Sequence, residues 1–161
     1  MKIRIGIASQ TLSLLDDGGG LARIYPVSSS KYGPGEKSGS FRTPRGLHVI
    51  RAKIGKGMPI NTVFVGRRPT GEIYSNALSG QFPDRDWILT RILWLCGREP
   101  GFNRFGDVDT MRRYIYIHGS PDTAEMGKPG SIGCIRMRNE DLVDLFERVK
   151  AGTEVDISES S

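Results

Sequence analysis

One stretch of the sequence combines the residue types of a nucleophilic enzyme. "YIYIHGSPDTAEMGKPGSIGCIRM", from Tyr114 to Met137, contains one histidine and one cysteine. The segment between His118 and Cys134 is rich in glycine and proline, which favours a surface loop that can fold back. A thiol is mostly protonated at neutral pH and needs a neighbouring base. The pattern therefore predicts an imidazole within hydrogen-bond reach of a thiol.

Glycine precedes the cysteine. Gly133 lets the backbone turn sharply and leaves peptide N–H groups free to face a developing oxyanion. A nucleophile, a base and oxyanion donors together predict acyl transfer, while a surface histidine and a buried cysteine are the alternatives. A zinc site is disfavoured because His48, Cys96, His118 and Cys134 lack paired ligand spacing. We expect neither a metal nor a cofactor.

The histidine follows an alternating pattern, "RRYIYIHGS". A period of two places Tyr114, Tyr116 and His118 on one face of a strand and Ile115 and Ile117 on the other. We expect the isoleucines to point to the core. His118 would then end the strand at a rim of the fold, outside the apolar interior.

The other patterns predict a mainly β protein. Strands are expected over residues 2–15 and 21–28, around the turn "DDGGG", and again at "LHVIRAKI" and "TEVDIS", while "TVFVGRRPTGEIYS" is expected to form a strand, a turn and a strand. "WILTRILWLCG" fits a buried strand or a short helix, and we favour the strand. Its Cys96 is expected to be packed and inert. Residues 87–104 would form core strands or, alternatively, cover the active site.

A single helix is predicted after the cysteine. Asn139 is a candidate cap, and Glu140 and Asp141 suit the positive end of a helix. Apolar residues then recur at helical spacing until Gly152, where the helix should stop.

Length and composition indicate one domain over residues 1–161. The chain has a mass of 17.8 kDa and 37% hydrophobic residues, enough for one core, and its 21 glycines and 9 prolines indicate many short elements. The net charge of +5 is scattered along the sequence, which favours a solvated surface over a nucleic-acid-binding face. We expect a monomer with no nucleic-acid partner and two free thiols.

The N-terminal segment "MKIRIGIASQTLSLLDDGGG" alternates like a strand and lacks the apolar run of a secretion signal. No segment approaches the roughly 20 apolar residues of a membrane span. We expect a cytoplasmic protein if this is the natural start, and a periplasmic or cell-envelope protein if a signal peptide has been removed.

Several motifs together resemble one known family. "IHGS" and "GKPGSIGCIRM" are similar to the signature of the YkuD-type L,D-transpeptidase catalytic domain, and "QTLSLLDDGGGLARIYPVSS", "TPRGLHVI" and "GTEVDI" resemble its opening hairpin, strand entry and closing strand. About residues 67–112 have no counterpart that we can place. The resemblance implies a mainly β barrel or sandwich with one short helix after the cysteine.

The resemblance also implies roles at the site. Cys134 would be the nucleophile and His118 its base, oriented by the carbonyl of Gly119. The N–H groups of Gly133 and Cys134 would form the oxyanion hole.

Further residues would complete the site. Arg136 and Ser131 would support it or hold a substrate carboxylate, with Tyr116 as a further substrate contact. Ile132 stands where many members of the family have histidine, a departure that could alter substrate preference.

The implied substrate is a peptidoglycan stem peptide or a soluble muropeptide, cleaved between an L-centred residue, usually of diaminopimelate, and the terminal D-Ala. Water as acceptor gives an L,D-carboxypeptidase in cytoplasmic muropeptide recycling, which we favour. An amine acceptor gives an L,D-transpeptidase that forms cross-links or exchanges D-amino acids. A non-catalytic peptidoglycan-peptide binding module and a nucleic-acid-binding domain are rival hypotheses from other classes.

Overall fold

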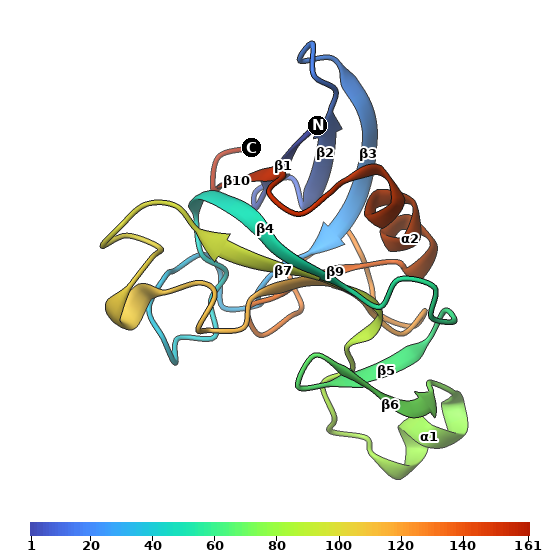
Figure 1. The fold of residues 1–161 in the computed structure, drawn as a ribbon. Coiled ribbons are helices and arrows are strands. Elements are labelled where there is room, and N and C mark those ends of the chain that lie inside the picture. The colour runs from blue at the N-terminus through green and yellow to red at the C-terminus, as the bar shows by residue number, and fades with distance from the viewer.

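The computed structural model describes residues 1–161 and shows a β-barrel (Figure 1). Hydrogen-bonded neighbours follow the order β4-β10-β1-β2-β3-β9-β8-β7, and β7 pairs with β4 to close the ring. The strands are β1 (Lys2–Gly6), β2 (Thr11–Leu15), β3 (Leu21–Ser28), β4 (Gly46–Ile54), β5 (Thr62–Val65), β6 (Arg68–Ile73), β7 (Leu89–Gly97), β8 (Tyr116–Gly119), β9 (Ile135–Met137) and β10 (Glu154–Ser158). The expected mainly β fold is confirmed.

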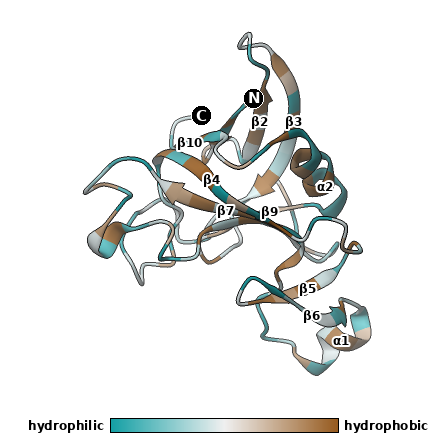
Figure 2. Cartoon of the chain, viewed as in Figure 1, coloured by the Kyte–Doolittle hydropathy of each residue, from teal (hydrophilic) through white to brown (hydrophobic).

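The barrel encloses one large apolar core. Twenty buried residues form it, among them Ile3, Leu93, Ile117 and Ile135. They come from alternate positions of the strands, as in the burial pattern of β2 and β10, so each strand turns one face inward. Figure 2 shows the same alternation of hydrophobic and hydrophilic residues along β4.

The expected single strand over residues 2–15 is wrong, because the chain reverses between β1 and β2. The turn has no Gly-Gly or Asn-Gly signal. Instead Gln10, with φ of +53°, fills the turn with its buried side chain. Its Nε2 donates to the Ile7 carbonyl at 2.8 Å and to Ser29 Oγ at 2.7 Å. The hydrogen bonds of the Gln10 side chain, one of them to a residue 19 positions away, thus stabilise a reversal that has no glycine turn.

The helix after the cysteine, α2 (Asn139–Arg148), is present but ends earlier than expected. It ends at Arg148 and not at Gly152, because Lys53 donates to the carbonyls of Phe146 and Val149, both at 2.7 Å. Those two bonds satisfy carbonyls that a helix end leaves free. Asn139 is not the cap: Arg138 holds that position without a side-chain hydrogen bond.

Residues 67–112, which had no placed counterpart, form β6, β7 and two short helical elements. β5 and β6 form a hairpin that joins β7 through Val63 and Leu89 and lies beside the barrel in Figure 1. A second helix, α1 (Asn76–Gln81), was not predicted, and a 3-10 turn, η1, covers Gly106–Val108. Neither helix is long and apolar enough to cross a membrane.

The ambiguous segment is a strand, as we favoured. β7 pairs with β4, β5 and β8 and is buried over most of its length, so residues 89–97 belong to the core. Cys96 and Cys134 are both free thiols, as expected. Cys96 is half-buried rather than fully packed.

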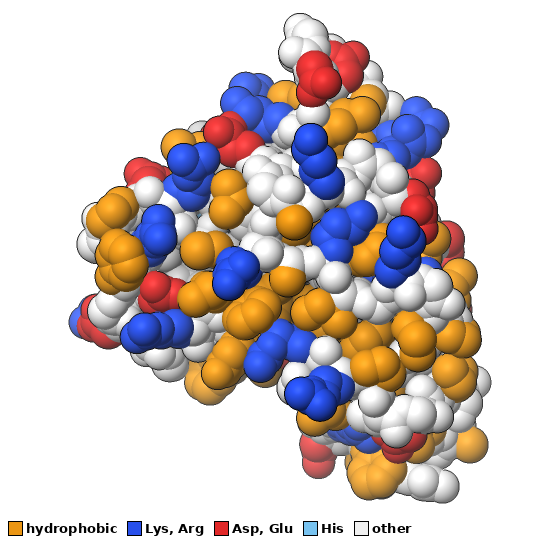
Figure 3. Space-filling model, in the orientation of Figure 1, with side chains coloured by type: hydrophobic (Ala, Val, Ile, Leu, Met, Phe, Trp, Pro, Cys, Tyr) orange, Lys and Arg blue, Asp and Glu red, His pale blue; other side chains and the backbone are white.

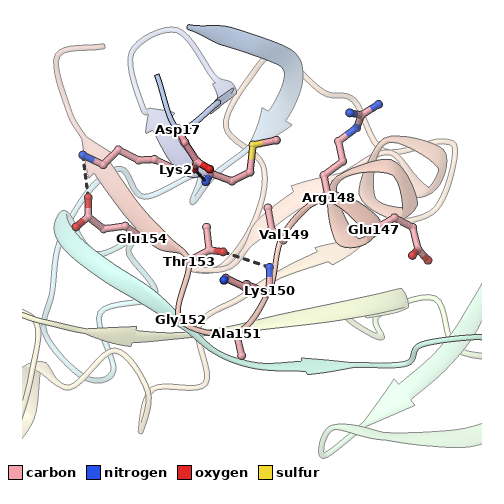
Figure 4. A pocket seen from close by; sticks show the side chains of 11 residues that line it. Lys2, Asp17, Glu147, Arg148, Val149, Lys150, Ala151, Gly152, Thr153 and Glu154 are labelled. Carbon is pink, nitrogen blue, oxygen red and sulfur yellow. Dashed lines mark hydrogen bonds and ion pairs between the residues drawn. The ribbon is translucent and has the colours of Figure 1, made fainter. Parts of the chain in front are cut away.

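The surface shows no single dominant charge. Figure 3 shows Lys and Arg side chains spread over the visible face, with hydrophobic side chains gathered over β5, β6 and the neighbouring end of β7. The largest cavity, 880 Å³, lies between β1 and the segment after α2 and contains neither a cysteine nor a histidine (Figure 4). Several charged residues that line this cavity pair with one another, as Lys2 does with Glu154 at 2.9 Å. Without a cysteine or a histidine, the cavity lacks the nucleophile and the base that acyl transfer needs.

Candidate active site

Two parallel strands bring the predicted nucleophile and base together. β8 pairs with β9 so that Ile117 faces Ile135 and His118 faces Arg136. Cys134, just before β9, therefore lies beside Tyr116, whose N–H donates to the cysteine Sγ at 3.3 Å. Since side chains alternate along a strand, His118 and Tyr116 project from the same face of β8.

His118 is held in one tautomer. Its Nδ1 lies 2.6 Å from the carbonyl oxygen of Gly119, which can only accept, so Nδ1 carries the proton and Nε2 is free to act as a base. No group of the chain hydrogen-bonds to Nε2. The other histidine, His48, uses both ring nitrogens, with the Gly46 carbonyl and Thr110 Oγ1 each at 3.0 Å. His48 is therefore structural, whereas His118 retains an unused acceptor.

The expected rim position of His118 is wrong. The residue is 1% exposed, because β7 covers it on one side, where Ile92 is its partner, and β9 covers it on the other. The isoleucines do point to the core as predicted, since Ile115 and Ile117 belong to the main apolar cluster.

A buried polar network surrounds Gly119. Thr90 Oγ1 donates to Asn139 Oδ1 at 2.6 Å, and Asn139 Nδ2 donates to the Ser120 carbonyl at 3.0 Å and to Asn61 Oδ1 at 3.1 Å. A Cβ on Gly119 would overlap Asn139 Oδ1 and the Leu89 carbonyl. The asparagine amide thus turns inward and cannot cap α2. It fixes the backbone whose carbonyl orients His118.

Asn139→Ala is expected to destabilise the fold by about 2–3 kcal/mol, because buried partners lose their hydrogen bonds, and to slow acylation of Cys134 in the protein that remains folded. The matched control is Asn103→Ala. Asn103 is equally buried and makes three comparable bonds, to Arg45, Leu47 and Glu99, at the other end of β7. Urea denaturation and the rate of Cys134 acylation measure the two effects. Equal acylation rates in the two variants would contradict a positioning role for Asn139.

The thiol and the imidazole do not form the expected hydrogen bond. Cys134 Sγ instead accepts from the Tyr116 N–H and points its own proton to the Tyr114 carbonyl at 3.5 Å. Catalytic hydrogen bonds are commonly loose in enzymes without substrate. The structure shows a resting arrangement in which Cys134 and His118 lie on paired neighbouring segments without a hydrogen bond between them.

The turn before the cysteine is built by Ser131, Gly133 and Thr43. Gly133 has φ of +133°, a conformation that favours glycine. Its carbonyl accepts from the buried Thr43 Oγ1 at 2.9 Å, which gives the "TPRG" motif a structural role. Ser131 Oγ donates to the Cys134 carbonyl at 2.6 Å. Ser131 is 1% exposed and supports this turn, so it is not placed to hold a substrate carboxylate.

Only one of the two predicted oxyanion donors is free. The Gly133 N–H donates to Ser131 Oγ at 3.2 Å, while the Cys134 N–H makes no hydrogen bond within the chain. The Cys134 N–H is therefore the backbone donor that is free to hydrogen-bond to an oxyanion. The role of Gly133 as a donor stays a prediction.

The electrostatics favour a neutral resting pair. Burial raises the pKa of Cys134 to about 12, although the Tyr116 N–H, Arg136 and Arg113 act in the opposite direction. Burial also lowers the pKa of His118 below its ordinary value of 6.5, despite the hydrogen bond to Gly119. Both shifts disfavour the charged forms. At neutral pH the site holds a thiol and a neutral imidazole, not a thiolate–imidazolium pair.

Alkylation of Cys134 by iodoacetamide, without substrate, is therefore expected to rise about tenfold per pH unit from pH 7 to 10, because the reactive thiolate fraction grows in this way below the pKa. Mass spectrometry of the Cys134 peptide separates this reaction from that of Cys96. A rate that is constant from pH 6 to 9 would show a preformed ion pair and contradict the neutral state.

A groove passes over the cysteine. One cavity of 570 Å³ is lined by Cys134 together with Arg67, Tyr114 and Tyr116, and cavities of 340 and 260 Å³ adjoin it. All three share Ile132, which is 42% exposed. The residue that departs from the family pattern thus stands where the three spaces meet.

Arg136 is less available to a substrate carboxylate than expected, because its guanidinium already has partners within the chain. Its guanidinium pairs with Asp86 at 2.9 Å and donates to the Gly130 carbonyl at 3.1 Å. A substrate carboxylate would have to compete with Asp86. Arg113 likewise donates to the backbone carbonyls of Gly35, Glu36 and Arg42. Of the predicted substrate contacts, Tyr116 lines the groove.

Two charged residues of the groove, Asp86 and Arg67, were not predicted from the sequence. Both lie in the stretch without a placed counterpart. Arg67 and Arg68 are adjacent in the sequence, and no local pattern distinguishes one arginine from the other.

Comparisons with known proteins agree with this geometry. The family model described as the L,D-transpeptidase catalytic domain matches residues 1–157. The Bacillus subtilis protein YkuD, named as an L,D-transpeptidase, is 34% identical over 90 residues, which cover 55% of this chain and 49% of YkuD. YqjB of the same organism is 39% identical over 61 residues, or 38% of this chain and 33% of YqjB. The chain spans half or less of the length of these relatives.

Solved structures share the fold at low identity. L,D-transpeptidase 3 from Mycobacterium tuberculosis, solved with a faropenem-derived adduct, has a TM-score of 0.59 at 17% identity, covering 98% of this chain and 59% of that one. An L,D-transpeptidase of Enterococcus faecium gives the same TM-score and identity, with 98% and 49% covered.

Proposed function

Since the chain belongs to the L,D-transpeptidase catalytic domain family, we propose that it transfers the acyl group of a peptidoglycan tetrapeptide stem through a thioester on Cys134. The observation that carries this proposal is the contrast between the two buried histidines. His118 alone has a fixed tautomer and an unused Nε2, and it lies beside the thiol and the free Cys134 N–H.

The reaction begins with a rotation of the Cys134 side chain that brings its S–H to His118 Nε2. The imidazole takes the proton as sulfur attacks the carbonyl between diaminopimelate and D-Ala. The Cys134 N–H donates to the oxygen that becomes negative. The tetrahedral species then breaks its C–N bond, His118 returns the proton to the leaving amine, and D-Ala departs.

The thioester is resolved by a second nucleophile. As acceptor we propose water, which makes the protein an L,D-carboxypeptidase that trims soluble muropeptides in cytoplasmic recycling. Transfer to an amine in the cell envelope is the second candidate, and the transpeptidase names of the relatives favour it. Both acceptors use the same acyl-enzyme.

The test is mass spectrometry of a defined disaccharide tetrapeptide incubated with the purified protein, with and without a D-amino acid or a second stem peptide. Loss of D-Ala alone supports the carboxypeptidase, and an exchanged or cross-linked product supports the transpeptidase. Binding without any product would overturn catalysis and favour a peptidoglycan-peptide binding module.

A further inference from the structure

One arginine of the groove is neither paired with an acid nor bound to backbone carbonyls. Arg136 is paired with Asp86 and Arg113 is used by backbone carbonyls, but Arg67 makes no ion pair. Its guanidinium lies over two neighbouring aromatic rings, 4.7 Å from the centroid of Trp94 and 4.8 Å from that of Tyr114. Nη1 donates to the Tyr116 hydroxyl at 3.0 Å. The two ring contacts and the hydrogen bond hold the group in place without neutralising its charge.

The backbone is strained at Arg67 and at one of the aromatic residues that it contacts. Gly66 and Arg67 form the two-residue turn between β5 and β6, with φ of +57° and +64°. Hairpin turns of this kind favour glycine or asparagine, and an arginine there costs free energy. Tyr114, one of the two rings that contact Arg67, also has positive φ, at +56°. Strain at non-glycine residues concentrates at functional sites, and here two strained residues hold one side chain in place.

Tyr116 connects the arginine to the nucleophile. Its N–H donates to Cys134 Sγ, and its hydroxyl accepts from Arg67. The guanidinium therefore lies about one tyrosine side chain away from the thiol and lines the same 570 Å³ cavity. A guanidinium has five N–H donors in a planar fork, and only one of them is used within the chain.

We propose that Arg67 binds a carboxylate of the stem peptide and is a specificity-determining residue of the donor site. A fixed, unpaired guanidinium is suited to bidentate carboxylate recognition. The inference rests on the proposed function, which supplies an acyl donor with one such group on each residue that flanks the scissile bond: the terminal carboxylate of D-Ala and the side-chain carboxylate of diaminopimelate.

The test compares Arg67→Gln with Arg68→Gln on three substrates: the tetrapeptide, its terminal carboxamide and its diaminopimelate carboxamide. Arg68 is the adjacent, exposed arginine and lies outside the groove, so its variant makes the same charge change. On the parent peptide, Arg67→Gln should lower kcat/KM by about 10- to 100-fold, and Arg68→Gln by less than about 2-fold.

The amidated substrates identify the bound group. On the carboxamide that lacks the carboxylate bound by Arg67, wild type and Arg67→Gln should have nearly the same kcat/KM. On the other carboxamide, Arg67→Gln should keep its full loss of kcat/KM. Arg67→Lys should fall between wild type and Arg67→Gln, because an ammonium lacks the planar fork. An equal defect on all three substrates would overturn the inference and reduce Arg67 to packing.

Binding separates failure of this inference from failure of the proposed function. The Kd of each peptide is measured for Cys134→Ala, with and without Arg67→Gln. If wild type turns nothing over but Arg67→Gln weakens only peptides that carry the carboxylate, the proposed function fails and the carboxylate site stands. Equal Kd values for all peptides would overturn the carboxylate site.

Discussion

Cys134→Ala is expected to lower release of D-Ala from a tetrapeptide by at least about 10⁴-fold, to the solvent background, because no other group near His118 can form the acyl-enzyme. The backbone turn should survive, since Ser131 and Thr43 hold it through main-chain carbonyls. Product formation is measured by chromatography of the peptide mixture.

The matched control is Cys96→Ala. Cys96 is the second free thiol, half-buried on β7 and outside the groove. Its replacement should leave the rate within about 2-fold of wild type. Comparable losses in both variants would indicate damage to the fold and not loss of a nucleophile.

His118→Ala is expected to slow acylation of Cys134 by about 10²- to 10⁴-fold, the usual contribution of a general base. The pH dependence should change as well. In wild type, the neutral imidazole accepts the proton, and its lowered pKa keeps it neutral at pH 7, so the rate should fall only below pH 6.5. Without His118 the thiol must ionise unaided, and the rate should rise about tenfold per pH unit above neutrality, towards the Cys134 pKa of about 12.

His48→Ala provides the comparison, because His48 is also buried and also bonded to a backbone carbonyl. Its second nitrogen is already used by Thr110, so its loss should lower stability and leave the pH profile of the folded protein unchanged. A His118 variant with the wild-type pH profile would contradict its role as the base.

The strands near the site could be predicted because their patterns are local. Alternation in "RRYIYIHGS" placed Ile115 and Ile117 in the core, and β7 and the final strand were likewise found from short apolar runs. The reversal at Gln10 could not be found in this way, since its stabilising partner, Ser29, lies 19 residues further along the chain.

Some features of the site could likewise be predicted from local sequence, whereas others depend on the fold. The nature of the nucleophile and base, and the need for Gly133, follow from residues close in sequence. The pairing of Arg136 with Asp86 and the contacts of Arg67 with Trp94 and Tyr114 depend on segments far apart in the chain. The family resemblance implied that Arg136 supports the site or holds a carboxylate, whereas the fold pairs Arg136 with Asp86 and leaves Arg67 without an ion pair.

The most direct test of a thioester mechanism is to trap the intermediate. Wild-type protein is mixed with the tetrapeptide, quenched in acid within the first turnover and digested. The mass of the peptide that contains Cys134 is then measured by mass spectrometry. We predict that this peptide gains the mass of the substrate minus D-Ala, and that neither the Cys96 peptide nor the Cys134→Ala protein gains it. Release of D-Ala at the wild-type rate by Cys134→Ala, or an adduct on another residue, would contradict the mechanism.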